Sequence, residues 1–498
     1  MRRLFTLVVF AVVPLRAEPQ TARVDIKWEK VLLTSKTTPT LQVVVNPPLR
    51  RGSAIHDAAF TALRDLGADY VRYVPWLPYP KLGVAELEPP SNGRTSWDFS
   101  LIDPLTIDFL EATKGHSVVL NFSTIPQWMY RTERPVAYPA DPDEAVWNYE
   151  QGDTLRDTTF REAADYFARL LSWYTKGGFT DELGRRHESG HRYVVPFWEV
   201  LNEMETEHHF TPETYTRFYD AVVEVMRQVQ PETKFVGLSL AFPMWEPQYV
   251  EYFLDPTHHK PGIPLDYVSY HFYASPWADQ PADVQQHTFW AQANQFISVV
   301  MYAEAIRKRL SPTTGVMINE VGSILPSDFP QDSTAAARAA AIPESYWNLS
   351  GAMYAFLFGE LSRQGIDVLG MSQLVGYPTQ FPSVTMIDWR SGRPNARYWV
   401  LKLVKDHFGP GDRIVDFAQE QGEHPVFVYP VVAKGGERRI MLVNQRDRPI
   451  DVVVTGAQAA GVSYVDQETG FGPPETRRLT GEVVTLKGLA VAVVTLSH

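Results

Sequence analysis

Two glutamates, each directly preceded by an asparagine, stand at the ends of apolar runs that are far apart in the chain. One run leads to Asn202-Glu203, and the other leads to Asn319-Glu320. Two facing carboxyl groups can cleave a glycosidic bond, because one protonates the departing oxygen while the other attacks the anomeric carbon or activates water. A single Asn-Glu dipeptide is weak support, since Glu203 could equally be a loop carboxylate or cap the next helix. Two such dipeptides at strand ends favour the catalytic interpretation.

The elements that must position these glutamates are short apolar runs that alternate with helical stretches. Eight strands are expected, namely Leu41–Asn46, Tyr70–Pro75, Ser117–Phe122, Val194–Leu201, Lys234–Leu240, Asp266–Phe272, Val316–Asn319 and Val368–Gln373. They are apolar almost throughout, which is typical of strands covered on both faces. Helices are expected at Thr158–Tyr174, Pro212–Val229, Thr288–Leu310 and Ser345–Arg363. This alternation predicts an α/β chain with a parallel (β/α)8 barrel over residues 40–408, whose working groups lie at the carboxyl ends of the strands.

The pattern of predicted elements changes after Gly409–Gly411, a segment typical of a linker. Short β-type runs follow, separated by turn clusters, and they predict an all-β sandwich domain over residues 412–498. Pro430 stands inside the first run, Val426–Val432, and a proline there predicts an edge strand or a bulge. No catalytic constellation is found in this region.

The N-terminus and the composition indicate where the protein is located and which partners it can have. Arg2 and Arg3 precede the apolar run Leu4–Val13, so residues 1–17 are expected to be a signal peptide; a buried N-terminal strand is the alternative. A secreted or periplasmic protein is therefore expected, without a membrane anchor. The chain has no cysteine, which excludes disulfides and a thiol nucleophile. Its net charge of −12 argues against a nucleic-acid partner.

Further motifs resemble those of a known enzyme family. A glutamate after the fourth strand and another after the seventh resemble clan A glycoside hydrolases. The segments Trp97–Asp103, Asp266–Tyr273 and Gly392–Arg397 are similar to family 39, which contains β-xylosidases and α-L-iduronidases. The resemblance implies a retaining double displacement on an oligo- or polysaccharide, with Glu320 as nucleophile and Glu203 as acid/base. It implies no cofactor and no metal.

The resemblance also implies roles for residues around the two glutamates. Asn202 would hold a substrate hydroxyl, and His271 and Tyr273 would line the floor beside Glu320. Ordinary core packing is the alternative for His271 and Tyr273. Asn46 and Arg72, on the first two strands, could support the carboxylates through hydrogen bonds, although Arg72 could also be a structural ion-pair member.

The sequence departs from the family pattern at two places that touch substrate recognition. Met204 follows the acid/base where family members often have proline, and Met371–Gln373 stands where the eighth strand usually carries a tryptophan. Tyr377 or Trp389 could supply the aromatic platform instead. A preference for pentoses, as in the β-xylosidases of the family, is therefore not expected for this chain.

Four tryptophans near strand ends could also stack on sugar rings, since aromatic faces do so as readily as they pack in cores. They are Trp76, Trp128, Trp245 and Trp277, of which Trp128 is the first choice.

Two alternative functions remain open at this stage. One is a carbohydrate-binding barrel that has lost catalysis, which the presence of both glutamates disfavours. The other is a zinc hydrolase, since His187-Glu188 and His191 match the H-E-x-x-H pattern. That pattern needs a helix, and the surrounding glycines and arginines favour a loop. The acidic stretch Glu203–His209 is interpreted as a subsite wall rather than a metal site.

Overall fold

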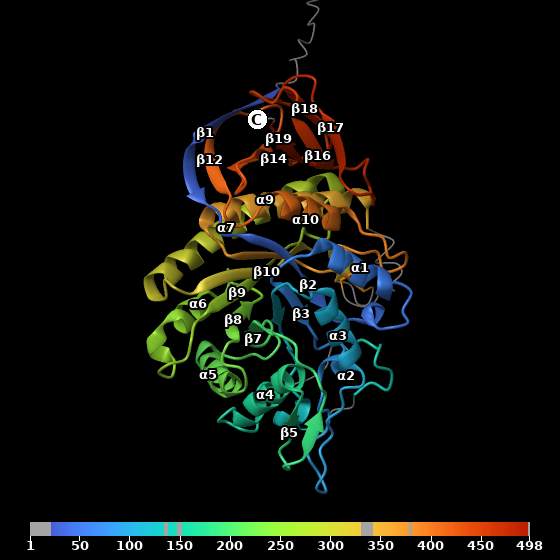
Figure 1. Cartoon of the computed structure of the whole chain (residues 1–498), viewed down its shortest axis with the longest axis vertical. Coiled ribbons are helices and arrows are strands. Elements are labelled where there is room, and N and C mark those ends of the chain that lie inside the picture. The colour runs from blue at the N-terminus through green and yellow to red at the C-terminus, as the bar shows by residue number, and fades with distance from the viewer. Residues whose placement is uncertain (1–20, 134–137, 147–151, 330–341, 378–380, 497–498) are drawn as a thin grey trace, which may run out of the picture.

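The computed structural model of the chain describes residues 21–133, 138–146, 152–329, 342–377 and 381–496. The predicted signal peptide lies outside these ranges. In Figure 1 a β-sheet region occupies one end of the molecule and a barrel with its helices occupies the rest. Within the described residues, no helix is both long enough and apolar enough to cross a membrane.

Eight parallel strands close into a barrel, as the sequence predicted. They are β2 (Thr38–Val44), β3 (Val71–Val74), β4 (Val118–Leu120), β7 (Phe197–Glu199), β8 (Lys234–Leu240), β9 (Tyr267–Ala274), β10 (Gly315–Ser323) and β11 (Val368–Met371). Each lies within or overlaps a predicted run. The fourth strand, β7, is much shorter than the predicted run Val194–Leu201. It ends at Glu199, and Glu203 lies four residues beyond it in a turn.

Helices alternate with these strands on the outside of the barrel. They are α1 (His56–Leu66), the short α2 (Pro80–Gly83), α3 (Ile102–Ala112), α4 (Arg161–Lys176), α5 (Pro212–Val229), α6 (Pro247–Leu254), α7 (Ala282–Leu310), α9 (Glu344–Gln364) and α10 (Ala396–His407). The bounds of α5 are those predicted, because the Thr211 side chain accepts a hydrogen bond from the Thr214 N–H and caps the helix. Between α4 and β7, a hairpin is formed by β5 (Gly178–Thr180) and β6 (Arg186–Glu188).

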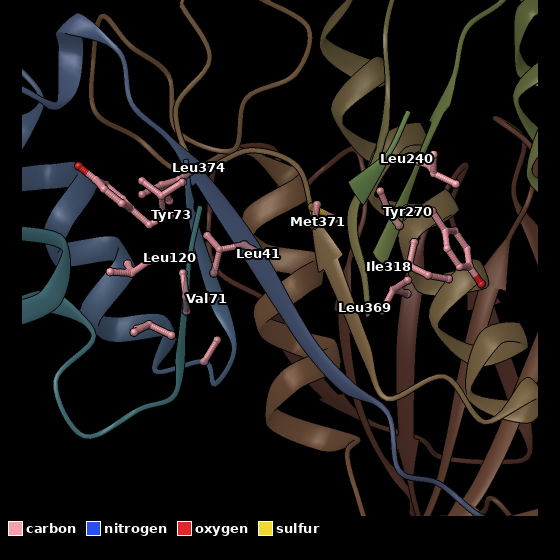
Figure 2. Packing of buried hydrophobic residues seen from close by; sticks show 14 of the residues in the cluster. Leu41, Val71, Tyr73, Leu120, Leu240, Tyr270, Ile318, Leu369, Met371 and Leu374 are labelled. Atoms are coloured by element: carbon pink, nitrogen blue, oxygen red, sulfur yellow. The ribbon is translucent and has the colours of Figure 1, made fainter. Parts of the chain in front are cut away.

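The barrel strands bury one face against the helices and the other inside the barrel. Figure 2 shows the outer set, which includes Tyr73, Tyr270 and Ile318. Residues one position away along each strand point inward, because side chains alternate across a strand. Some of these form a small apolar cluster of Val119, Phe197, Val236, Met317 and Val368. The inward residues nearer the carboxyl ends of the strands are polar, and there the candidate site is built.

The predicted all-β region is confirmed, and its strands form one continuous sheet. In sheet order the strands are β17 (Glu475–Arg478), β16 (Gly461–Val465), β19 (Val491–Thr495), β14 (Arg438–Asn444), β13 (Val426–Val432), β12 (Arg413–Glu420), β1 (Ala22–Thr34), β15 (Ile450–Val454) and β18 (Val483–Leu486). This sheet buries a second apolar core of its own. The sequence interpretation did not include β1, which joins the sheet from the other end of the chain and lies beside β12 in Figure 1.

The prediction that Pro430 marks an edge strand or a bulge is wrong, since β13 pairs with β14 through Pro430 without a register shift. Its strand, β13, lies between β12 and β14. Pairing of β13 with β12 covers only Val431 and Val432 and ends before Pro430. A proline has no N–H to donate, so it is tolerated where the neighbouring strand has already turned away.

Candidate active site

A turn beyond β7 carries the first glutamate. Leu201 and Glu203 have φ angles of 65° and 40°. This left-handed conformation costs a non-glycine residue roughly 1–3 kcal/mol and is found mainly where function requires it. The Glu203 N–H donates to the Ser239 carbonyl at 2.9 Å, which fixes the turn against β8.

A register shift in β10 places the second glutamate. The pairing of β10 is irregular between Met317 and Glu320 relative to β9, and between Ile318 and Val321 relative to β11. In a regular strand, Asn319 and Glu320 would point to opposite faces, whereas a bulge re-aims a side chain. Here both reach inward: Asn319 donates to buried Glu199 at 2.7 Å, and Glu320 accepts from Tyr273 at 2.7 Å.

The two glutamates predicted from the sequence converge on one point. A carboxylate oxygen of Glu203, a ring nitrogen of His271 and a carboxylate oxygen of Glu320 all lie within 4.8 Å of one another. Among the described residues, these three are the group close enough to hold a metal ion. In this structure His271 Nδ1 and Glu203 Oε1 are 2.8 Å apart and are hydrogen-bonded to each other.

Glu320 is held as an anion. Burial alone would raise its pKa, but the positive charges of His271 and Arg72 and the hydrogen bonds from Tyr273 and Arg72 outweigh that effect. The pKa of Glu320 therefore lies below its usual value. A buried carboxylate that stays ionised near a second carboxyl group can act as a nucleophile.

His271 bridges the two glutamates. Its Nδ1 lies 2.8 Å from Glu203, and its Nε2 lies 3.1 Å from Ser239 Oγ and 3.6 Å from Glu320. Burial lowers the pKa of His271, but the charge of Glu320 and the hydrogen bond to Glu203 raise it further, so the net pKa lies above the ordinary value. The imidazole is thus favoured in its cationic form between two acids.

A buried layer of ion pairs lies beneath Glu320. The Arg72 side chain is fully buried; it donates from Nε to Glu199 at 2.5 Å and from Nη1 to Glu320. Glu199 also accepts hydrogen bonds from Asn121, Ser269 and Asn319, so its donors come from β3, β9, β10 and the end of β4. This layer orients Arg72 toward Glu320.

The segment that carries both glutamates matches a known family. Residues 183–342 match the family model described as glycosyl hydrolases family 39. The resemblance predicted from the sequence is thereby confirmed over this segment. A search of curated proteins finds no match for the chain.

Solved structures show the same architecture. A family 39 β-xylosidase from Caulobacter crescentus is 15% identical, with a TM-score of 0.60, and the match covers 96% of this chain and 100% of that one. A family 51 α-L-arabinofuranosidase from Bifidobacterium longum is 13% identical, with a TM-score of 0.62 and coverage of 97% and 100%. A glucosidase from Croceicoccus marinus has 13% identity, a TM-score of 0.61 and the same coverage. At such identities the likeness shows the fold.

A third carboxyl group, Glu207, was not singled out by sequence reasoning. It accepts hydrogen bonds from the Trp76 indole at 2.5 Å and from Asn202 at 2.8 Å. Burial, followed by the charge of Glu203, raises its pKa well above the ordinary value. Glu207 is therefore held as a neutral acid. Asn202 Oδ1, the oxygen of the same amide, accepts a hydrogen bond from Arg72 at 2.6 Å, and the two contacts together fix the orientation of the amide.

Three other residues predicted for the site form no hydrogen bond with Glu203 or Glu320 among the described residues. Asn46 donates to the Val44 and Val375 carbonyls rather than to a carboxylate. The Trp128 indole donates to the Glu86 carbonyl, and the Arg156 guanidinium lies 4.5 Å from its ring centre, so one face of the ring is covered. Tyr377 is half-buried, with its ring 6.4 Å from that of Tyr79.

The histidines of the H-E-x-x-H pattern do not meet. His187 lies on β6 and contacts Asp181 at 2.9 Å, whereas His191 contacts Asp103 at 3.3 Å. Because the segment is a hairpin and its end rather than a helix, the two rings do not share one face. The zinc interpretation therefore has no site here.

His208, from the acidic stretch after Glu203, is also structural. It is buried between the Tyr130 hydroxyl and the Ser123 carbonyl. Both ring nitrogens of His208 are thus engaged in hydrogen bonds within the protein.

Proposed function

We propose that the chain is a retaining glycoside hydrolase in which Glu320 is the nucleophile and Glu203 the acid/base. The observation that carries the proposal is the convergence of their carboxylate oxygens to within 4.8 Å, with an ionised Glu320. Retaining enzymes hold their two carboxyl groups about 5–5.5 Å apart, whereas inverting enzymes leave roughly 6.5–9.5 Å for a water molecule. The family match over residues 183–342 supports glycosidase activity.

In the first step, Glu320 attacks the anomeric carbon as the bond to the leaving oxygen breaks, and Glu203 gives its proton to that oxygen. In the second step, Glu203 takes a proton from water, the water oxygen attacks the anomeric carbon, and Glu320 departs as a carboxylate. Arg72, Tyr273 and His271 stabilise the negative charge of Glu320 before attack and after release. Their hydrogen bonds also keep the attacking oxygen oriented.

The substrate is proposed as a carbohydrate glycoside, with the sugar left open by the departures from the family pattern. Asn202 is proposed to hold a sugar hydroxyl, and the fixed orientation of its amide between Arg72 and Glu207 supports this role. The basic and apolar start of the chain supports a further proposal, that the enzyme is exported.

The test separates catalysis from mere binding. Aryl glycosides of different sugars are screened first, and the active one is then assayed with Glu203→Ala and Glu320→Ala. Glu320→Ala should abolish turnover. Glu203→Ala should keep fast glycosylation with an activated leaving group and, with added azide, should give a glycosyl azide of retained configuration. Glu213→Ala, a carboxyl group on the outer helix α5, is the control and should behave as wild type.

Wild-type protein that binds sugars but hydrolyses none of the screened glycosides would instead support the carbohydrate-binding alternative. An azide product of inverted configuration would show that the two glutamates have other roles.

A further inference from the structure

Four large apolar side chains stand exposed on two neighbouring loops at the barrel mouth. Phe242, Met244 and Trp245 follow β8, with 52%, 40% and 70% of their surface exposed, and Trp277 follows β9, with 72% exposed. We call these four residues the apolar rim. A single exposed apolar residue is ordinary, but a group of them on a functional face indicates a binding surface.

The apolar rim is tied to the acid/base side of the site. The Phe242 N–H donates to Glu205 Oε1 at 3.1 Å, and Glu205 stands two positions beyond Glu203. The strand before Trp277 carries His271, which is hydrogen-bonded to Glu203. Since β8 pairs with both β7 and β9, the loops after these three strands emerge next to one another. The leaving group that Glu203 protonates must extend over this side.

The side chains of the rim indicate the chemistry of that leaving group. Residues 241–245 read Ala-Phe-Pro-Met-Trp and contain no hydroxyl, amide or charged side chain. A second sugar could stack on the two tryptophans, as the sequence predicted, but its several hydroxyls would also need hydrogen-bond partners, of which the side chains of residues 241–245 offer only one. The indole N–H of Trp245 is the one side-chain donor in this segment. Phe, Met and Trp surfaces instead gain free energy by covering hydrocarbon.

We propose that the apolar rim binds the aglycone of the substrate and that this aglycone is apolar, an extended hydrocarbon or an aromatic ring system rather than another sugar. The proposal rests on the proposed glycosidase function, because it assigns the leaving-group side of the same site.

The experiment compares methyl and octyl glycosides of the sugar that the aryl-glycoside screen identifies. Both leaving groups are simple alkanols of similar acidity, so the chemical step is matched and only the apolar contact differs. The octyl glycoside should have a kcat/KM at least about tenfold higher, because several methylenes leave water. Trp245→Ala and Trp277→Ala should each remove most of that advantage while the methyl glycoside changes less than about twofold.

Tyr302→Ala is the matched control, since this aromatic side chain is 56% exposed on the outer helix α7. It should leave the octyl-to-methyl ratio unchanged.

The possible failures are distinct. Equal kcat/KM for the two glycosides overturns the inference and leaves the glycosidase intact. A preference for a disaccharide over the octyl glycoside, lost in Trp245→Ala, assigns the rim to sugar and also overturns it. Vesicle binding that depends on Trp245, with an octyl-to-methyl ratio near one, assigns the rim to a membrane surface instead. If no glycoside is hydrolysed, the proposed function fails, and calorimetric binding of the octyl against the methyl glycoside of each screened sugar still decides about the rim.

Discussion

In the proposed mechanism, the hydrogen bond from Tyr273 to Glu320 helps to set the lower pH limit of activity, so Tyr273→Phe should move that limit upward. The hydroxyl lies 2.7 Å from Oε2 of the buried Glu320, in a hydrogen bond that is partly buried. A hydrogen bond to a charged group contributes about 1.5–3 kcal/mol. One pKa unit corresponds to about 1.36 kcal/mol, so its loss should raise the pKa of Glu320 by about one to two units. Because Glu320 must be ionised to attack, the acidic limb of kcat/KM should shift to higher pH by that amount.

The assay is the pH profile of kcat/KM with an activated aryl glycoside, which reports the ionisations of the free enzyme. Tyr270→Phe is the matched control. Tyr270 lies on the same strand and is also buried, but its hydroxyl has no hydrogen-bond partner among the described residues. An acidic limb that moves by less than about 0.3 units in Tyr273→Phe would refute the reasoning, and so would an equal shift in Tyr270→Phe.

Three further changes test the buried acids around the site. Glu199→Gln should lower the free energy of unfolding by about 3–5 kcal/mol, because it breaks the ion pair with Arg72 in a fully buried layer. Thermal unfolding measures this change. Glu251→Gln is the control: it breaks an exposed ion pair and should lower the free energy of unfolding by less than about 1 kcal/mol. Glu207→Gln should keep kcat/KM within about threefold at pH 6, because the carboxyl is already neutral; a hundredfold loss would mean that Glu207 works as an anion. Burial, then Glu203, raises the pKa of Glu205 from 4.5 to about 7, so folding retains a proton that the unfolded chain releases. Wild-type stability should therefore fall as pH rises between these values, and Glu205→Gln should weaken this dependence in urea titrations at several pH values.

The sequence predicted the barrel and the glutamate pair because both depend on local patterns. Eight apolar runs that alternate with helical stretches fit one closed parallel sheet, and the carboxyl ends of its strands necessarily share one rim. Two acids placed just after the fourth and seventh runs are thereby brought to the same rim, and the register shift in β10 then turns Glu320 inward. The exact bounds of α5 were accessible for the same reason, since Thr211 and Pro212 are start signals that need no tertiary contact.

Other parts of the site depend on contacts that no local pattern encodes. Glu199 looks like the polar end of an apolar strand, yet it accepts hydrogen bonds from four neighbours that lie far from it in the chain. Glu207 appears in the sequence as one acid among several, and only burial beside Trp76 makes it neutral. The covering of Trp128 by Arg156 is a matter of loop conformation, which sequence spacing does not specify.

The position of β1 has a consequence for how the protein is made. This strand precedes the barrel, but its hydrogen-bonding partners β12 and β15 follow the barrel. At about 5–20 residues per second, a ribosome needs on the order of tens of seconds to synthesise the intervening chain. During that time the buried side chains of Ala22, Val24 and Ile26 have no sheet to enter. The barrel is thus an insertion within the β-region, and a chain interrupted after α10 would leave β1 as an unpaired, aggregation-prone strand.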